Sequence, residues 1–455
     1  MSINNSLNMN LIKKRSYFKQ VLFIATPTII QGIVMQLQAL ISKAFLGSIK
    51  TEYLSSIGNA MVPYFFTLAV IFSISTGLTI VVSRNIGYNK FTEISQYFES
   101  SVFFNTIMCM GLFLLWYFFS EYIFLIIGVN QLIINYCIEY MRILAFSFIF
   151  LGYEVSLQST LQGLGITKPI MYSGILKVAI QILLDWILIL GNLGFPSYGI
   201  TGAAISALIS NVLAIIFMTV YVIHFKCFNI NIFNFKNPYW SKYKHVIKIG
   251  LPTGFENVIW NIGNIILIKT LNDIDVNAVG IFTLTCNIES LVFMFYNGIA
   301  ISTLTLVGQK IGANNKKEAK AIVVTCIRYN VILISIFFVI FLLFSKDIIS
   351  IFVKDFSFIS GTSIYLIITS IILFPKSINS IVGSGIRGIG NTKWMMFTQL
   401  FGTGLIIFMC NLLVYNFTIN ITAIYLIIFI DEILRVIINV LYFVKTDSSN
   451  NSKIV

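Results

Sequence analysis

Apolar runs of about 20 residues or more alternate with short polar breaks along the whole chain. Because a helix needs about 20 apolar residues to cross a bilayer, this pattern predicts twelve membrane-spanning helices. The predicted spans cover residues 20–46, 57–82, 98–119, 131–160, 170–190, 199–223, 246–270, 278–307, 322–344, 359–386, 396–415 and 421–443. The predicted fold class is therefore an all-α integral membrane protein.

Composition strengthens this prediction. Of the 455 residues, 57% are hydrophobic and only 10% are charged, with a mean hydropathy of +0.90. Soluble domains carry about a quarter of their residues as charged side chains, so a soluble enzyme with a single anchor is excluded. The first apolar stretch extends to Gly47, which is too long for a signal-peptide core of roughly 7–15 residues. We expect it to be retained as the first helix.

The net charge of +13 follows from where the basic residues lie. They concentrate in the loops on one side, as the positive-inside rule describes. With the N-terminus inside, the inner loops and tail hold Arg84, Lys90, Lys168, Lys226, Lys236, Lys242, Lys244, Lys310, Lys316, Lys317, Lys320, Lys393 and Lys445, and the outer loops hold Lys50, Lys346 and Lys354. We expect a plasma-membrane protein with both termini in the cytoplasm and no nucleic-acid partner.

The metal-binding residue types form no recognisable site in the sequence. The six cysteines are scattered without a CxxC spacing, and the two histidines, His224 and His245, flank one predicted loop. We therefore expect no metal site and no cofactor. No clustered catalytic set is visible either, so we expect a protein that is not an enzyme.

Three sequence blocks recur in the second half of the chain, and all three are shifted by the same number of positions, which we call the duplication offset. The pairs are 24–28 with 249–253, 86–89 with 311–314, and 162–168 with 387–393. Six spans per repeat give both repeats the same orientation, as in parallel-repeat transporters whose halves rock around a midplane site. The predicted organisation is a tail (1–19), an N-lobe (20–223), a cytoplasmic linker (224–245), a C-lobe (246–443) and a second tail (444–455).

The duplication includes a proline near the start of the first and seventh spans, Pro27 and Pro252. A proline inside a helix lacks an N–H and frees the carbonyl four residues earlier, which allows the helix to bend. Both are candidate helix-bending residues, and a static kink is the alternative for each.

Ionisable residues inside the predicted spans are expensive to bury and therefore indicate function. Asp185 and Glu154 have apolar neighbours on both sides, and steps of four residues place Lys177, Gln181 and Asp185 on one helix face. The candidates for ion coupling are Asp185, Glu154, Gln181, Ser42 and Thr201, and those for a substrate cavity are Gln38, Tyr153, Glu256 and Asn379. We expect two groups, Glu139 with Arg142 and Asp431 with Glu432 and Arg435, to be self-neutralising structural clusters.

Four motifs give the chain a resemblance to the multidrug and toxic compound extrusion (MATE) family over residues 20–445. They are residues 184–189 (LDWILI), 198–204 (YGITGAA), 308–314 (GQKIGAN) and 387–393 (RGIGNTK). The resemblance implies a two-lobe exporter of organic, often cationic, compounds that alternates between inward- and outward-open states in exchange for H⁺ or Na⁺.

Within the family the chain resembles the DinF-like branch. Asp185 falls on that branch's fifth-helix acid, Gln181 replaces its asparagine, and Pro27 falls on its bending proline. The expected first-helix acid is replaced by Ser42. We hypothesise that Glu154 supplies the missing carboxylate.

One alternative interpretation is a flippase for a lipid-linked oligosaccharide or another amphipathic lipid, from the same superfamily. Such flippases usually carry several cavity arginines, whereas Arg142 is the only arginine well inside a predicted span of the N-lobe. We therefore prefer an exporter of small molecules that works in the lipid bilayer as a monomeric transport unit.

Overall fold

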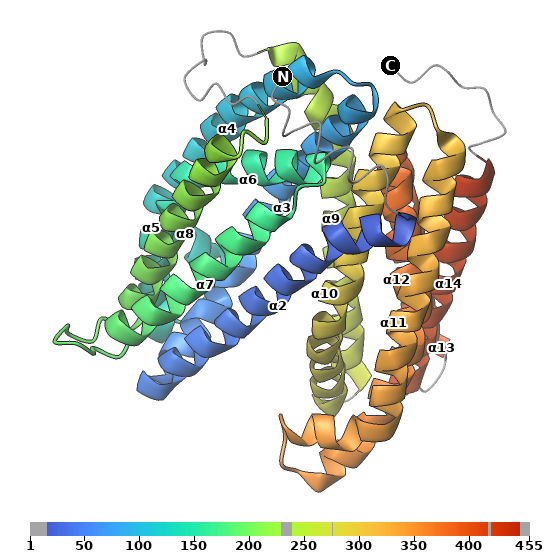
Figure 1. Cartoon of the computed structure of the whole chain (residues 1–455). Helices are drawn as coiled ribbons and strands as arrows, with labels where there is room; N and C mark the ends of the chain where they lie inside the picture. Colours follow the sequence, from blue (N-terminus) through green and yellow to red (C-terminus); the bar gives the residue numbers. More distant parts are fainter. Residues whose placement is uncertain (1–15, 229–238, 275, 417–419, 446–455) are drawn as a thin grey trace. The chain divides into compact units, whose positions relative to one another are not determined.

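The computed structural model describes residues 16–228, 239–274, 276–416 and 420–445, and within these ranges it is helical without strands. Figure 1 shows the order of the helices along the chain. Their bounds are α2 Tyr17–Ile49, α3 Thr51–Gly87, α4 Phe91–Ile127, α5 Gln131–Ala145, α6 Ser147–Leu164, α7 Lys168–Leu188, α8 Gly199–His224, α9 Trp240–Ile274, α10 Val276–Gly312, α11 Lys316–Ser350, α12 Phe356–Ile389, α13 Thr392–Asn416 and α14 Ile421–Lys445.

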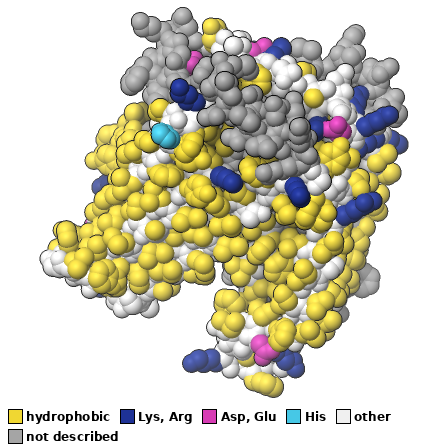
Figure 2. Space-filling model, in the orientation of Figure 1, with side chains coloured by type: hydrophobic (Ala, Val, Ile, Leu, Met, Phe, Trp, Pro, Cys, Tyr) yellow, Lys and Arg dark blue, Asp and Glu magenta, His cyan; other side chains and the backbone are white. Residues whose placement is uncertain are grey.

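Most of the described helices are long and apolar enough to cross a membrane. Nine helices in the described part of the chain pass this test alone, and a bent pair of helices brings the number to ten. Apolar side chains cover most of the visible surface in Figure 2, as expected for helices that face lipid rather than water. The prediction of an all-α membrane protein is confirmed, and twelve spans are consistent with these helices.

The fourth predicted span, 131–160, is wrong as a single helix. The chain forms α5 and α6 there, which are bent by 52° relative to each other. The break lies at Phe146, where the Ser147 hydroxyl donates to the carbonyl of Leu144 at 2.6 Å. A serine that bonds to the preceding turn competes with the helical hydrogen bonds and favours a bend.

The same pairs of helices pack in both halves of the chain. In the first half α3 packs on α6, α4 on α6 and α7 on α8, and the equivalent pairs α10 on α12, α11 on α12 and α13 on α14 pack in the second half. A duplication at the level of packing therefore accompanies the duplication in sequence.

Two of the duplicated sequence blocks form matching turns. Asn89 and Asn314, which are related by the duplication offset, have φ values of 58° and 56°, and Gly165 and Gly390 have φ values of 77° and 98°. Asparagine and glycine tolerate this left-handed region better than other residues. The shared residues are thus those that the turns require. Each of these turns follows a helix rather than a strand, so it is not a phosphate loop.

The chain divides into two compact units, and both divisions fall beside the duplicated prolines. Unit 1 includes residues 26–251, and unit 2 includes residues 16–25 and everything from Pro252 onward. The first turns of α2 therefore belong to unit 2, and the first turns of α9 belong to unit 1. The predicted lobes, 20–223 and 246–443, correspond to the same two halves, but they do not include this exchange of first turns. The lobe boundaries stay a prediction.

The predicted tails and linker lie largely at the edges of the described residues. Residues 1–15, 229–238 and 446–455 fall outside them, and α9 already begins at Trp240, inside the predicted linker.

Candidate functional site

The first candidate centre is built around Asp185, which lies three residues before the end of α7. Apolar neighbours hold this helix in the membrane, while the side chain of Asp185 turns into unit 1 and is only 1% exposed. Helix α8 packs along α7 and brings polar side chains to the same level. A carboxylate in such a position depends on the hydrogen bonds that the protein supplies.

Two serine hydroxyls donate to the carboxylate, one to each oxygen. Ser42 of α2 donates to Oδ2 of Asp185, and Ser206 of α8 donates to Oδ1. Gln38 lies one turn before Ser42 and donates to its hydroxyl from Nε2 at 2.8 Å. The structure therefore joins the predicted residues Gln38, Ser42 and Asp185 into one chain of hydrogen bonds.

A second polar pair lies one turn away on the same two helices. The hydroxyl of Ser210 on α8 donates to Oε1 of Gln181 on α7 at 3.4 Å. Sequence reasoning missed both Ser206 and Ser210, although their spacing of four residues places them on one face of α8. Serines in an apolar helix are common, so only the isolated acid on the neighbouring span signalled that they had a partner.

Asp185 has no cation within ion-pairing distance among the described residues, and this separates it from the buried acids of unit 2. Glu256 pairs with Arg387 and Glu289 with Lys376, each at 2.5 Å. Asp431 and Glu432 both pair with Arg435. Within the described ranges, the hydrogen-bond donors to the Asp185 carboxylate are two neutral hydroxyls.

Glu154, the acid proposed to replace a first-helix carboxylate, lies on α6. It accepts a hydrogen bond from Nε2 of Gln158 on its own helix at 3.0 Å. Asp185 bonds to the serines of α2 and α8 instead. The structure therefore does not join the two acids directly, and the hypothesis about Glu154 stays a prediction.

The remaining candidates of the first half lie apart from Asp185. Thr201 donates to Oε1 of Glu139 at 2.9 Å in an exposed position. The hydroxyl of Tyr153 accepts from Thr219 of α8 at 3.1 Å, and its ring meets Phe98 edge to face.

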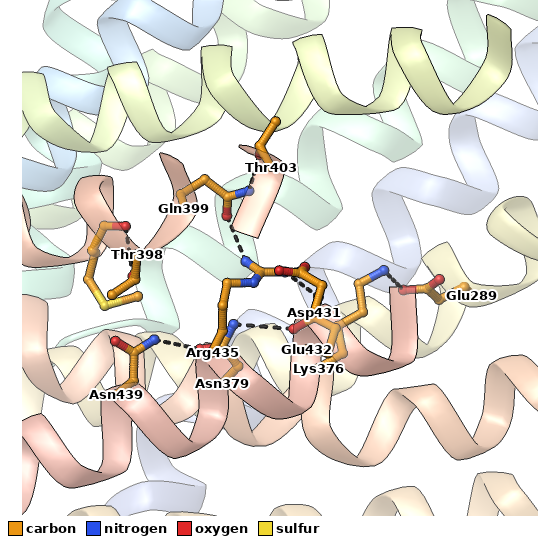
Figure 3. A network of polar contacts seen from close by, with 11 residues as sticks. Glu289, Lys376, Asn379, Thr398, Gln399, Thr403, Asp431, Glu432, Arg435 and Asn439 are labelled. Carbon is orange, nitrogen blue, oxygen red and sulfur yellow. Dashed lines mark hydrogen bonds and ion pairs between the residues drawn. The ribbon is translucent and has the colours of Figure 1, made fainter. Parts of the chain in front are cut away.

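In unit 2 the polar side chains form a network of ion pairs, shown in Figure 3. Arg435 of α14 lies at its centre, because Nη2 contacts Asp431 and Glu432, each at 2.7 Å. Nη1 of Arg435 donates to Oε1 of Gln399 on α13, also at 2.7 Å. The expected self-neutralising cluster thus extends across two helices, and its members are at least nine-tenths buried.

The predicted cavity residue Asn379 belongs to this network. Its Nδ2 donates to Glu432 at 3.2 Å, and its Oδ1 accepts from Asn439 at 2.8 Å. Figure 3 also shows the ion pair of Glu289 and Lys376. Three carboxylates and two cations leave one negative charge in excess.

Glu256, another predicted cavity residue, forms a separate pair in the middle of α9. It is 9% exposed and accepts from Nη2 of Arg387 in the last turn of α12. The sequence placed Arg387 in a loop motif, which concealed this pairing.

Both predicted bending prolines lie inside continuous helices. Pro27 is in α2 and Pro252 in α9, and each is buried. Each lies at or next to the residue where its helix passes from one compact unit to the other.

In the described part of the chain no group of three or more His, Cys, Asp or Glu residues is arranged to hold a metal ion. Asp185, Ser42 and Ser206 offer oxygen atoms to a proton or to a hard monovalent cation instead.

The MatE family model matches the chain twice, at residues 27–187 and 252–413. The second match starts one duplication offset after the first, so the family model recognises the same internal repeat.

Relatives and solved structures agree with this match. The chain is 26% identical over 388 residues to a probable multidrug resistance protein NorM of Thermotoga maritima, covering 82% of this chain and 80% of that one. It is 21% identical to a probable multidrug resistance protein YoeA of Bacillus subtilis, covering 85% of each. An outward-facing multidrug resistance MATE family transporter matches with a TM-score of 0.88 and 19% identity, covering 96% of this chain and 97% of that one. The chain therefore belongs to the MATE family of multidrug efflux transporters.

Proposed function

We propose that this transporter is a secondary active exporter that exchanges organic, cationic or amphipathic compounds for H⁺ or Na⁺ by alternating access. Asp185 is the ion-coupling carboxylate. The observation that supports this most is its environment, since it is 1% exposed and its carboxylate accepts from the hydroxyls of Ser42 and Ser206. A buried acid without a cation must bind a proton or another positive ion to be neutralised.

The donors also explain how the ion can leave. Hydrogen bonds from hydroxyls stabilise the charged form of a carboxylate, so an empty site tolerates the negative charge for part of a cycle. Ser42 and Ser206 lie on different helices, α2 and α8. A change in the position of either helix changes the affinity of Asp185 for its ion.

The lipid-flippase alternative has no support from the relatives described above, which are named as multidrug resistance proteins. In the proposed arrangement the protein is a multi-pass plasma-membrane transporter with both termini in the cytoplasm and a monomeric transport unit.

The test is dye efflux from proteoliposomes that carry an imposed pH gradient or an imposed Na⁺ gradient. Efflux driven by one gradient names the coupling ion, and Asp185→Asn should abolish that drive because the amide cannot exchange a positive ion. Asp347→Asn makes the same chemical change at an exposed position and should transport like the wild type. Gradient-driven efflux that survives in Asp185→Asn would remove Asp185 from the coupling mechanism.

A further inference from the structure

The first turns of α2 and α9 are equivalent segments, and each docks on a different compact unit. Residues 16–25 belong to unit 2, and the α9 residues up to Leu251 belong to unit 1. Each segment ends next to one of the duplicated prolines, Pro27 and Pro252. The contacts that hold the two segments can therefore be compared position by position across the duplication offset.

An aromatic stack anchors both segments at the same place. Tyr243 of α9 stacks on Phe104 of α4 with ring centroids 4.8 Å apart. The equivalent pair, Phe18 of α2 and Tyr329 of α11, stacks at 4.1 Å. The duplication has kept the stack and exchanged the ring that carries the hydroxyl.

The location of that hydroxyl changes the hydrogen bonding. The Tyr243 hydroxyl donates to Oδ1 of the buried Asn105 at 2.9 Å, and Nδ2 of Asn105 donates to Ser156. The equivalent asparagine, Asn330, is also fully buried and donates to Ser377 at 2.7 Å, but its Oδ1 has no partner among the described residues. Phe18 occupies the position equivalent to Tyr243, and it has no hydroxyl to donate to Asn330.

The α9 segment also has an ion pair that the equivalent position of the α2 segment does not form. Lys242 precedes Tyr243 and pairs with Glu93 of α4 at 2.9 Å, while its ammonium group lies 4.6 Å from the ring centroid of Tyr97. The position equivalent to Lys242 is Tyr17, which has no charge. The carboxylate equivalent to Glu93 is Glu318, which pairs with Lys310 instead.

The α9 segment also makes a close glycine contact with α3. A Cβ on Gly77 of α3 would lie 2.8 Å from the amide nitrogen of Gly250, so only glycine fits this contact. The equivalent positions hold Ser302 and Ala25 instead of two glycines. Tyr243 is 4% exposed, whereas Phe18 is 36% exposed.

We propose that the two segments are duplicated clamps of unequal strength, and that the α2 clamp, residues 17–25, releases from unit 2 during the transport cycle while the α9 clamp stays docked on unit 1. At the positions equivalent to Lys242 and Tyr243 the α2 clamp carries Tyr17 and Phe18, which supply neither that ammonium group nor that hydroxyl. The buried acceptor Asn330 Oδ1 has no partner among the described residues. The release step rests on the proposed alternation between two states, whereas the unequal strength of the clamps does not.

Hydrogen exchange measures the two clamps directly in the full-length protein in lipid nanodiscs, because local opening limits exchange of helical amides. Residues 17–25 should exchange faster than residues 240–251. Phe18→Tyr supplies the missing donor and should slow exchange of 17–25 by about two- to tenfold, the range expected for one net hydrogen bond. Tyr243→Phe should speed exchange of 240–251 by a similar factor.

Dye efflux from proteoliposomes tests the release step with the same variants. Phe18→Tyr should slow gradient-driven efflux severalfold, and Tyr329→Phe, which leaves the Asn330 acceptor unchanged, serves as the matched control and should not. Unchanged exchange of 17–25 in Phe18→Tyr, or faster exchange of 240–251 than of 17–25 in the wild type, would overturn the proposal. Slowed exchange with unchanged efflux would also overturn release as a step of transport. Absence of coupled efflux in the wild type would instead contradict the proposed function, and exchange would still decide the strength of the clamps.

Discussion

The polar centres of the two halves occupy equivalent helix positions but differ in the groups that contact their carboxylates. Ser206 and Ser210 of α8 are equivalent to Asp431 and Arg435 of α14, and Asp185 of α7 is equivalent to Cys410 of α13. The acid has moved from one helix to its neighbour between the halves. The first centre has a carboxylate that contacts hydroxyls, and the second has ion pairs.

The position of the cation explains the difference. In the second half Asp431 and Arg435 are four residues apart on one helix, so the two charges meet. In the first half Lys177 is eight residues from Asp185, about 12 Å along the helix axis, and no ion pair forms between them. The position equivalent to Lys177 is Gly402, and a Cβ there would lie 2.8 Å from Cδ of Arg435. Glycine at this position leaves room for Arg435, which pairs with Asp431 and Glu432.

Under the proposed function, this comparison predicts that the first centre exchanges an ion, whereas the charged groups of the second centre pair with one another. Breaking a buried ion pair is costly, whereas an acid whose described partners are neutral hydroxyls can change its charge. We therefore expect substitutions in the second centre to affect stability first and substitutions in the first centre to affect coupling first.

The largest effect on stability should come from Arg435→Ser, which gives the second half the residue that Ser210 provides in the first. Removing the cation leaves Asp431 and Glu432 buried without a partner, and breaking a buried pair costs about 3–5 kcal/mol. Thermal unfolding of the purified protein should show a markedly lower midpoint, together with a low yield.

The matched control replaces the whole cluster rather than one member. The triple variant Asp431→Ser/Glu432→Ala/Arg435→Ser carries the residues of positions 206, 207 and 210 and should recover most of the stability, because no unpaired charge remains. Recovered stability without recovered efflux would show that the second centre also takes part in transport, contrary to the comparison.

After Asp185→Asn, the largest effect on coupling should come from Gln181→Arg. Residue 181 lies four positions before Asp185, so an arginine there can form the ion pair that the first centre lacks. We expect gradient-driven dye efflux to fall by about 100-fold or more, since neutralising the acid removes an exchange equilibrium worth several kcal/mol. The unfolding midpoint should change far less than in Arg435→Ser.

Gln181→Met is the control, because it removes the contact with Ser210 without adding a charge. It should keep coupled efflux within severalfold of the wild type. Equal losses in Gln181→Arg and Gln181→Met would mean that coupling requires the Gln181 amide itself, rather than an Asp185 without an ion-pair partner.

The elements that the sequence predicts well are those that depend on local pattern. The spans follow from apolar runs, and the duplication offset follows from the repeated sequence blocks. The break at Phe146 was not predictable in this way, because neither Phe146 nor Ser147 interrupts an apolar run, and the bend depends on a single side-chain hydrogen bond.

The site was predicted only in part, since its contacts join distant helices. Isolation in an apolar run identified Asp185, but nothing in sequence separates Ser206 from other membrane serines. Glu256 stood out as an isolated acid in the sequence because its partner, Arg387, is 131 residues away. Pairing of this kind is a property of helix packing, which a single sequence does not display.

Glu154→Gln tests whether the first centre has a second acid. Glu154 contacts Gln158 rather than Asp185, so we expect efflux to fall only about fivefold, less than the 10²-fold or greater range of a positioned proton-transfer group, with gradient dependence retained. Efflux like that of the wild type would end the hypothesis that Glu154 replaces the acid missing at Ser42. Complete loss would make Glu154 equal to Asp185.

The smallest effect should come from Thr201→Val. Thr201 is a predicted coupling residue, yet its hydroxyl donates to Glu139 in an exposed position rather than to Asp185. An exposed contact of this kind contributes about 1 kcal/mol or less, so the unfolding midpoint should fall slightly and coupled efflux should stay within twofold of the wild type. Valine keeps the shape of threonine and removes only the hydroxyl. A large loss of coupling would therefore extend the first centre from Asp185 to the start of α8. The carboxylate of Asp185 would then not account for coupling alone.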